Sequence, residues 1–250
     1  MIAATTLDWS APWFAPWRLP GEAALADVAQ GDAVFAALDA QAADPKFARF
    51  VRFVAADTLP AGTPYESFVR STATVPTRDN LHDFLNGIVW CLYPNTKRLL
   101  NRWQAEAIAR DGVQGRRGSL RDAITLFDEN GAVFSAPELL QLALKARDWH
   151  GLFVTHRALW PQARVWLFGH ALVEKLVAPR KDITAHVLCA PAGLADLPHV
   201  DAWLAETLDV QMLSGKPFAP LPVMGVPGWC AASEDPVFYA DQTVFRPARR

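Results

Sequence analysis

The spacing of apolar residues along this chain is mainly that of helices. Apolar positions three or four residues apart predict the following helices: 22–43 with a break near Gly31, 80–93, 95–110, 137–147, 150–160 and 198–208. Asp79 or Asn80 is expected to cap the helix that Pro94 stops, and Asn95 or Thr96 the helix after it, so that the two form a helical hairpin.

A smaller set of segments has strand character. Residues 183–190 predict a strand, residues 47–54 favour one, and residues 165–177 begin as strand or helix and continue as a helix from about Phe168. Two apolar runs around an Asn-Gly pair predict a β-hairpin over residues 123–135, since Asn-Gly readily accepts positive φ angles. The pattern therefore predicts an α+β fold, a mainly helical single domain (1–250) with a small antiparallel sheet.

Both ends of the chain are rich in proline and aromatic residues. Residues 1–21 form a Trp/Pro-rich arm in which regular helix is not expected. Residues 215–250 carry six prolines from Pro217 onward together with several aromatic rings. This long, irregular C-terminal tail is too aromatic to remain in solvent, so we expect it to wrap around the body of the protein.

Composition limits the class of protein. The chain has 250 residues, of which 51% are hydrophobic and 20% charged, and its net charge of −2 makes nucleic acid an unlikely partner. The three cysteines are far apart and form no CxxC pair, which fits a reducing compartment. With no signal peptide expected and no apolar run near the ~20 residues of a membrane span, the sequence predicts a soluble, cytoplasmic protein with no membrane partner.

Candidate chemistry gathers in residues 75–104, VPTRDNLHDFLNGIVWCLYPNTKRLLNRWQ. Polar side chains on helices that also carry core residues are either solvated or held inside by partners, and the second arrangement costs free energy. Helical spacing places His82, Asp83 and Asn86 on one helix as candidate catalytic residues. The candidate binding residues are Arg78, Lys97 and Asn101 here and Arg117 and Arg121 further along.

A second group of candidates could hold a divalent metal. His170 and Glu174 are four residues apart, a spacing that metal ligands on a helix use, and His186 on the following strand is a third candidate ligand. The alternative is a set of ordinary hydrogen bonds, because His and Glu four residues apart are common without a metal. Whether any cofactor is bound stays open.

Several familiar sites are excluded or weakened. GxSxG, GxGxxG and GxxxxGK[ST] motifs are absent from the sequence. The His82-Asp83 pair is similar to that of helical metal phosphohydrolases, which also need a histidine upstream, and no histidine precedes His82. Arg116, Arg117 and Arg121 could receive an anion, or form a solvated turn.

Several long motifs together resemble a bacterial family of unknown function, DUF3025. They are VPTRDNLHDFLNGIVW, RDAITLFDENG, LFGHALVEK, TAH and the tail PVMGVPGWC…DPVFYADQTVFRP, in this order between about Tyr65 and Pro247. The resemblance implies a bacterial source. It implies no activity, substrate or cofactor, because the family has none that is established.

Two functions remain open from the sequence. The first is a hydrolase-like enzyme, metal-assisted in one version, with a pocket between the helix of His82, Asp83 and Asn86 and that of His170 and Glu174. In it His170, Glu174 and His186 bind the metal, and Asp83 or His82 is the general base. The second is a non-catalytic interaction or binding module, with a small molecule as one open choice of ligand, in which the same polar residues form a structural network.

Overall fold

The computed structural model describes residues 7–47, 49–112 and 118–248. By its internal contacts the chain divides into two compact units. Unit 1 comprises residues 1–9, 16–125 and 197–216, and unit 2 comprises residues 10–15, 126–196 and 217–250. The prediction of a single domain is not decided by this division and stays a prediction.

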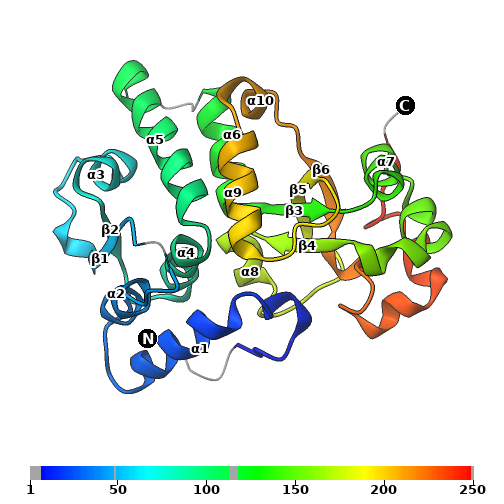
Figure 1. Cartoon of the computed structure of the whole chain (residues 1–250), viewed down its shortest axis with the longest axis horizontal. Coiled ribbons are helices and arrows are strands. Elements are labelled where there is room, and N and C mark those ends of the chain that lie inside the picture. Colours follow the sequence, from blue (N-terminus) through cyan, green and yellow to red (C-terminus); the bar gives the residue numbers. More distant parts are fainter. Residues whose placement is uncertain (1–6, 48, 113–117, 249–250) are drawn as a thin grey trace. The chain divides into compact units, whose positions relative to one another are not determined.

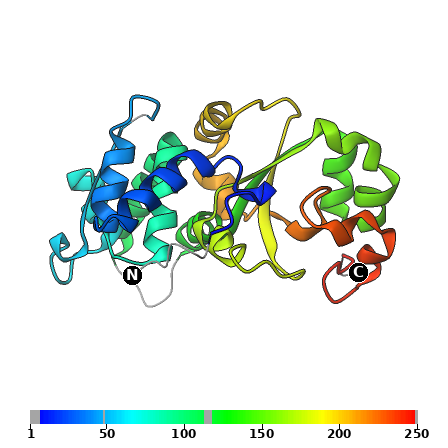
Figure 2. The ribbon, with the colours of Figure 1, turned by 90° about the horizontal axis from the view of Figure 1, so that it is seen from below.

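Unit 1 is mostly helical (Figure 1). Its helices and strands are α1 (Arg18–Ala29), α2 (Val34–Ala42), β1 (Arg52–Ala55), the 3-10 turn η2 (Ala56–Thr58), α3 (Tyr65–Thr72), β2 (Thr74–Thr77), α4 (Leu81–Leu92), α5 (Pro94–Asp111), α9 (Leu197–Thr207) and α10 (Val210–Ser214). The break between α1 and α2 at Gly31 confirms the prediction, and Figure 2 shows these two helices side by side in blue.

Helix α4 is the centre of unit 1. Phe84, Leu85, Ile88 and Val89 are completely buried, because they recur at the spacing of one helix face. The helix packs on α2, α5 and α9. Strands β1 and β2 pair in parallel, and β1 overlaps only the last three residues of the strand favoured over residues 47–54 and ends one residue beyond it.

Unit 2 is built around a four-stranded sheet in the order β4-β3-β5-β6. Its elements are η1 (Pro12–Phe14), β3 (Gly131–Ser135), α7 (Glu138–Ala146), η3 (Gly151–Thr155), η4 (Arg157–Gln162), β4 (Arg164–Leu167), α8 (His170–Lys175), β5 (Thr184–Ala190), β6 (Ala219–Pro222), η5 (Val223–Gly225), η6 (Ala231–Glu234) and η7 (Pro236–Ala240). The sequence predicts an antiparallel sheet, but the sheet is mixed. β3 pairs antiparallel with β4 but parallel with β5, and β5 pairs antiparallel with β6.

The predicted hairpin over residues 123–135 is wrong. Residues Ser119–Asn130 form helix α6, which runs through the boundary between the units, and only Gly131–Ser135 form a strand. Ala123, Ile124 and Phe127 are completely buried along one face of this helix, so tertiary packing outweighed the local turn preference of Asn-Gly. Gly131 is not in a positive-φ conformation, and it is needed because a Cβ there would collide with Phe127.

The aromatic tail from Pro217 onward packs within unit 2, and its wrapping of the whole body stays a prediction. Tyr239 and Phe245 are buried, and the ring of Phe153 stacks on Tyr239 at 4.7 Å between centroids. The tail is drawn in orange and red in Figure 2, beneath the light-green segment that contains α7 and η3. Part of it is regular, because β6 adds a fourth strand to the sheet.

Two further boundaries differ from the sequence predictions. Helix α1 begins at Arg18, so the last residues of the predicted arm are helical. Residues 150–160 form a π turn followed by a 3-10 turn rather than one α-helix. Among the described residues, no helix has the length and apolar character that crossing a membrane requires.

Candidate functional site

The predicted catalytic residues begin at the N-terminus of α4. Asn80 is its N-cap, as predicted, and its side-chain oxygen accepts a hydrogen bond of 2.8 Å from the Asp83 backbone N–H. The Asp83 carboxylate reaches back in turn and accepts a 2.8 Å bond from the Arg78 backbone N–H. The first bond satisfies an N–H that the helix start leaves open, and the second joins the chain before the helix to its first turn.

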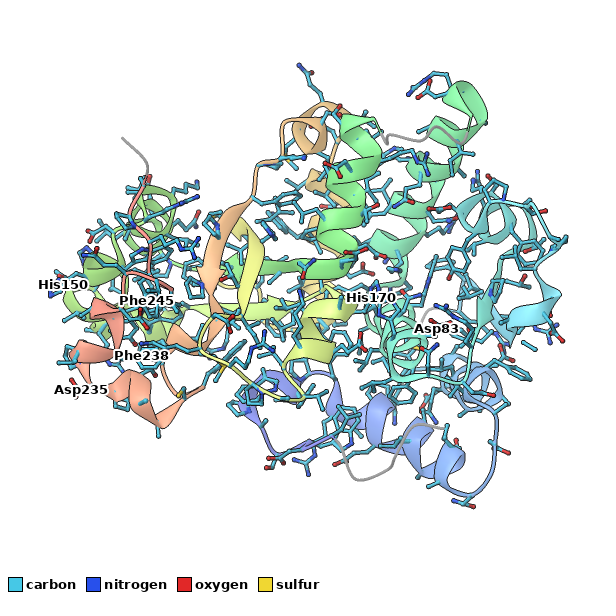
Figure 3. All side chains as sticks on the ribbon, turned by 180° about the vertical axis from the view of Figure 1, so that it is seen from behind. Asp83, His150, His170, Asp235, Phe238 and Phe245 are labelled. Atoms are coloured by element: carbon cyan, nitrogen blue, oxygen red, sulfur yellow. The ribbon has the colours of Figure 1, made fainter. Side chains whose placement is uncertain are left out.

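Asp83 is also held by the Arg78 side chain. Its two oxygens accept bonds of 3.0 Å from Arg78 Nε and 2.7 Å from Nη2, the fork geometry of a guanidinium on a carboxylate. Burial acts to raise the pKa of Asp83, but the hydrogen bonds and charge of Arg78 outweigh it and hold the pKa below the ordinary value. The carboxylate is therefore ionised, and both of its oxygens accept hydrogen bonds from Arg78. Figure 3 labels Asp83 on the ribbon of α4.

Asn86 and Lys97 connect α4 to α5. Lys97 is buried, with 6% of its surface exposed, and its ammonium donates a 2.9 Å hydrogen bond to Asn86 Oδ1. The same ammonium lies 5.3 Å from the centre of the Trp90 ring, within reach of a cation–π attraction. These contacts hold the ends of the helical hairpin together.

The remaining candidates in unit 1 have different surroundings. Asn101 donates a 3.0 Å hydrogen bond to the carbonyl oxygen of Glu66, which joins α5 to α3. His82 is half-buried on the first turn of α4. Arg121 lies on α6, and Arg116 and Arg117 fall outside the described residues, so the predicted anion loop is not described.

Asp201 is a site residue that the sequence reasoning missed. It is 2% exposed on α9, and its carboxylate accepts bonds of 3.0 Å from the Asn95 N–H, 2.8 Å from the Thr96 N–H and 2.6 Å from the Thr96 hydroxyl. These are donors at the start of α5, so Asp201 provides the cap that was predicted for Asn95 or Thr96. A lone Asp between apolar helix positions gave no signal of this role.

Unit 1 also contains a small, mainly apolar cavity. It is lined by Ala42, Phe47, Arg49, Phe50, Val51, Phe53, Trp90 and Cys91. The Arg49 guanidinium is engaged by Asp39 at 2.8 Å, and burial raises the pKa of the Cys91 thiol to about 12. A thiol with this pKa stays protonated and unreactive at neutral pH.

The predicted metal ligands all belong to unit 2. His170 begins α8 and lies buried with its Nδ1 3.8 Å from Asp128 Oδ2, while Glu174 is on the same helix. His186 is on β5, opposite Gly131 of β3. Burial and the Lys175 charge lower the pKa of His186, which favours its neutral form.

No three His, Cys, Asp or Glu side chains within residues 7–47, 49–112 and 118–248 are placed to hold a metal ion. His170, Glu174 and His186 therefore do not form such a group, and metal binding by them stays a prediction. The two helices predicted to wall one pocket belong to different units, α4 to unit 1 and α8 to unit 2, so the shared pocket stays a prediction.

Close packing positions His170. A Cβ on Gly169 would lie 2.5 Å from the Asn130 backbone nitrogen, so only glycine allows the start of α8 to approach the end of α6 this closely. Lys175 closes the other end of α8 with a 2.7 Å hydrogen bond to the Asn130 side chain. The GHALVEK motif is thus fixed against the segment that leads into β3.

Fold and site together define a mainly helical α+β protein in which charged and amide side chains bind helix ends and neighbouring helices. The chain belongs to the DUF3025 family, since the model of that family, a protein of unknown function, matches residues 51–249. This confirms the resemblance found in the motifs. No curated protein and no solved structure matches the chain.

Proposed function

We propose that this protein is a non-catalytic interaction or binding module whose α4–α5 polar residues have a structural role. The observation that supports this most directly is the occupation of Asp83. Its carboxylate receives three hydrogen bonds from Arg78, and its pKa lies below the ordinary value. A general base needs a pKa near the working pH and a free oxygen facing its substrate, so these contacts favour a structural carboxylate.

The neighbouring residues support the same interpretation. Asn86 binds Lys97, and Asn101 binds a backbone carbonyl of α3. Each contact joins two elements of unit 1, as expected of a network that fixes helix positions. The cavity beside Trp90 has room for about one water molecule and holds an unreactive thiol, so it supplies neither a substrate pocket nor a nucleophile.

The test is the sign of the stability change when Asp83 is replaced. In a structural role, Asp83→Asn lowers the free energy of unfolding by about 1 kcal/mol, discounted because the Arg78 side chain is 66% exposed. Removing a catalytic carboxylate often leaves stability unchanged or raises it, because active sites are held at a cost in stability. Urea unfolding of wild type and variant distinguishes the two.

The matched control is Glu106→Gln. Glu106 belongs to an exposed pair with Arg102 at 3.9 Å on α5, and its replacement should change stability by less than about 0.5 kcal/mol. An Asp83→Asn protein that is as stable as wild type, or more stable, contradicts the structural role.

A hydrolase-like enzyme is the second candidate, and one contact favours it. His170 Nδ1 lies 3.8 Å from Asp128 Oδ2, so the carboxylate could orient the imidazole as a general base. A panel of chromogenic esters and phosphoesters tests this, with His170→Gln expected to abolish any hydrolysis found. If no substrate of the panel is turned over, this candidate loses its support.

We also propose a bacterial cytoplasm as the setting. The family resemblance supports the bacterial source. Cys91, Cys189 and Cys230 are all free thiols, which fits a reducing compartment. Fractionation of cells that express the tagged chain tests the compartment.

A further inference from the structure

Helix α7 in unit 2 has an apolar stripe on its outer face. Its inner face buries Leu140, Ala143 and Leu144, which is the side that packs against the rest of the unit. On the outer face Leu139 is 54% exposed and Leu142 is 53% exposed. Helical spacing places Ala146, also exposed, in line with these two leucines.

The charges beside this stripe are of opposite sign at its two ends. Glu138 is in the first turn and Lys145 in the last, seven residues apart and therefore on the same side of the helix. Both are exposed, and within the described ranges neither forms an ion pair with its own chain.

This pattern is complementary to itself. If two copies of α7 lie antiparallel about a twofold axis near Leu142, that leucine meets its symmetry mate and Leu139 meets Ala146. The same operation brings Glu138 of each copy opposite Lys145 of the other, which makes two ion pairs across the contact. A parallel twofold arrangement would instead place Glu138 and Lys145 opposite the apolar side of the partner's stripe, so it would pair no charges. The helix therefore fits a second copy of the chain in one orientation.

We propose that α7 is a homodimer contact, with a second copy of this chain as the partner. The contact goes beyond the proposed function, because it names a partner and belongs to unit 2, whereas Asp83 belongs to unit 1. A helix of nine residues is about 14 Å long and buries much less than the ~800 Å² per partner of a stable dimer. The dimer is therefore weak and exchanges rapidly.

Sedimentation equilibrium of the full chain up to high protein concentration measures the association. Wild type is expected to form dimers in the high-micromolar range or above. Leu142→Glu should weaken the dimer at least tenfold, because it buries two unpaired carboxylates beside the axis. Leu19→Glu is the matched control, since Leu19 is 78% exposed on α1 in the other unit and should leave the association unchanged.

The charge pairing is tested by reversal and repair. Glu138→Lys alone, or Lys145→Glu alone, should weaken the dimer about fivefold at low salt. The double variant Glu138→Lys/Lys145→Glu restores the pairing and should recover wild-type association. Circular dichroism confirms that each variant is folded.

Three results would overturn the proposal. Wild type that remains monomeric at every concentration excludes a second copy as the occupant of this face. Association that survives Leu142→Glu places the contact elsewhere. A double variant as weak as the single variants excludes the antiparallel pairing. None of these outcomes affects the structural role of Asp83, so the two proposals fail separately.

Discussion

At the scale of single residues, the buried carboxylates of unit 1 have one recurring task. Asp83 binds donors that precede α4, and Asp201 binds donors at the start of α5. Asp201 satisfies N–H groups at the positive end of α5, and Asp83 joins the chain before α4 to the first turn of that helix. A carboxylate suits this setting because its two oxygens can accept several N–H and O–H hydrogen bonds at once.

Asp83 therefore gives the protein a defined response to acid. Its pKa in the folded protein is below the ordinary value of 3.8, so ionisation stabilises the fold. This contribution is complete above the unfolded-state pKa and is lost as the pH falls through the folded-state pKa. The stability difference between wild type and Asp83→Asn should be constant above pH ~5 and shrink below pH ~4.

Urea unfolding of both proteins across this range measures the difference. A difference that stays constant down to pH 3, or that grows, would show that the charge on Asp83 does not stabilise the fold.

The two carboxylates also show that a sequence reveals contacts between residues close together in the chain but not between distant ones. Asn80 could be recognised as a cap because its partner, Asp83, is three residues away and short-range capping has a known pattern. Asp201 could not, because its partner Asn95 is 106 residues away. The assignments of Asn86 and Lys97 to neighbouring helices were sound, but only the structure shows that they bind each other.

At the scale of elements, α6 shows where local preference fails. Its apolar residues have helical spacing, yet the Asn-Gly pair and the flanking apolar runs also fit a hairpin. Burial of Ala123, Ile124 and Phe127 favours the helix, and this burial depends on partners distant in sequence. Helices α4, between Asn80 and Pro94, and α7, after Pro137, were predictable because the residues that begin or end them are next to them in the sequence.

The C-terminal tail contributes aromatic side chains to the core of unit 2, so their loss should lower its stability. Phe245 is 2% exposed and meets Phe153, Trp149 and Tyr239 edge to face, and Figure 3 labels it with Phe238, 5.7 Å away between ring centroids. Phe245→Ala should lower the free energy of unfolding by about 3–5 kcal/mol, since it leaves a cavity among these rings. Urea unfolding followed by tryptophan fluorescence measures it.

Val237→Ala is the matched control for this prediction. Val237 is in the same tail but 73% exposed, so its truncation should change stability by less than about 0.5 kcal/mol. If the two substitutions have equal effects, the tail does not contribute to the core of unit 2.

At the scale of the whole molecule, neither unit is a continuous stretch of chain. The chain passes between them at Trp9/Ser10, Ala15/Pro16, Thr125/Leu126, Asp196/Leu197 and Lys216/Pro217. One of these junctions lies inside helix α6. A unit made of separate segments cannot be excised as one continuous fragment, and the single folding domain stays a prediction.

Calorimetry tests this prediction. One transition with equal calorimetric and van't Hoff enthalpies is expected for a chain that unfolds as a whole. Two transitions, of which Phe245→Ala shifts only one, would contradict it and make the units separate domains.

The cap that Asp201 places on α5 has a consequence for protein synthesis. A ribosome makes the chain from its N-terminus, at about 5–20 residues per second. α5 is complete at Asp111, but the carboxylate that satisfies its first turn is not made until residue 201. For several seconds the first-turn amides of the nascent α5 therefore have only water as their partner, and the final docking of the helix must wait for the last fifth of the chain.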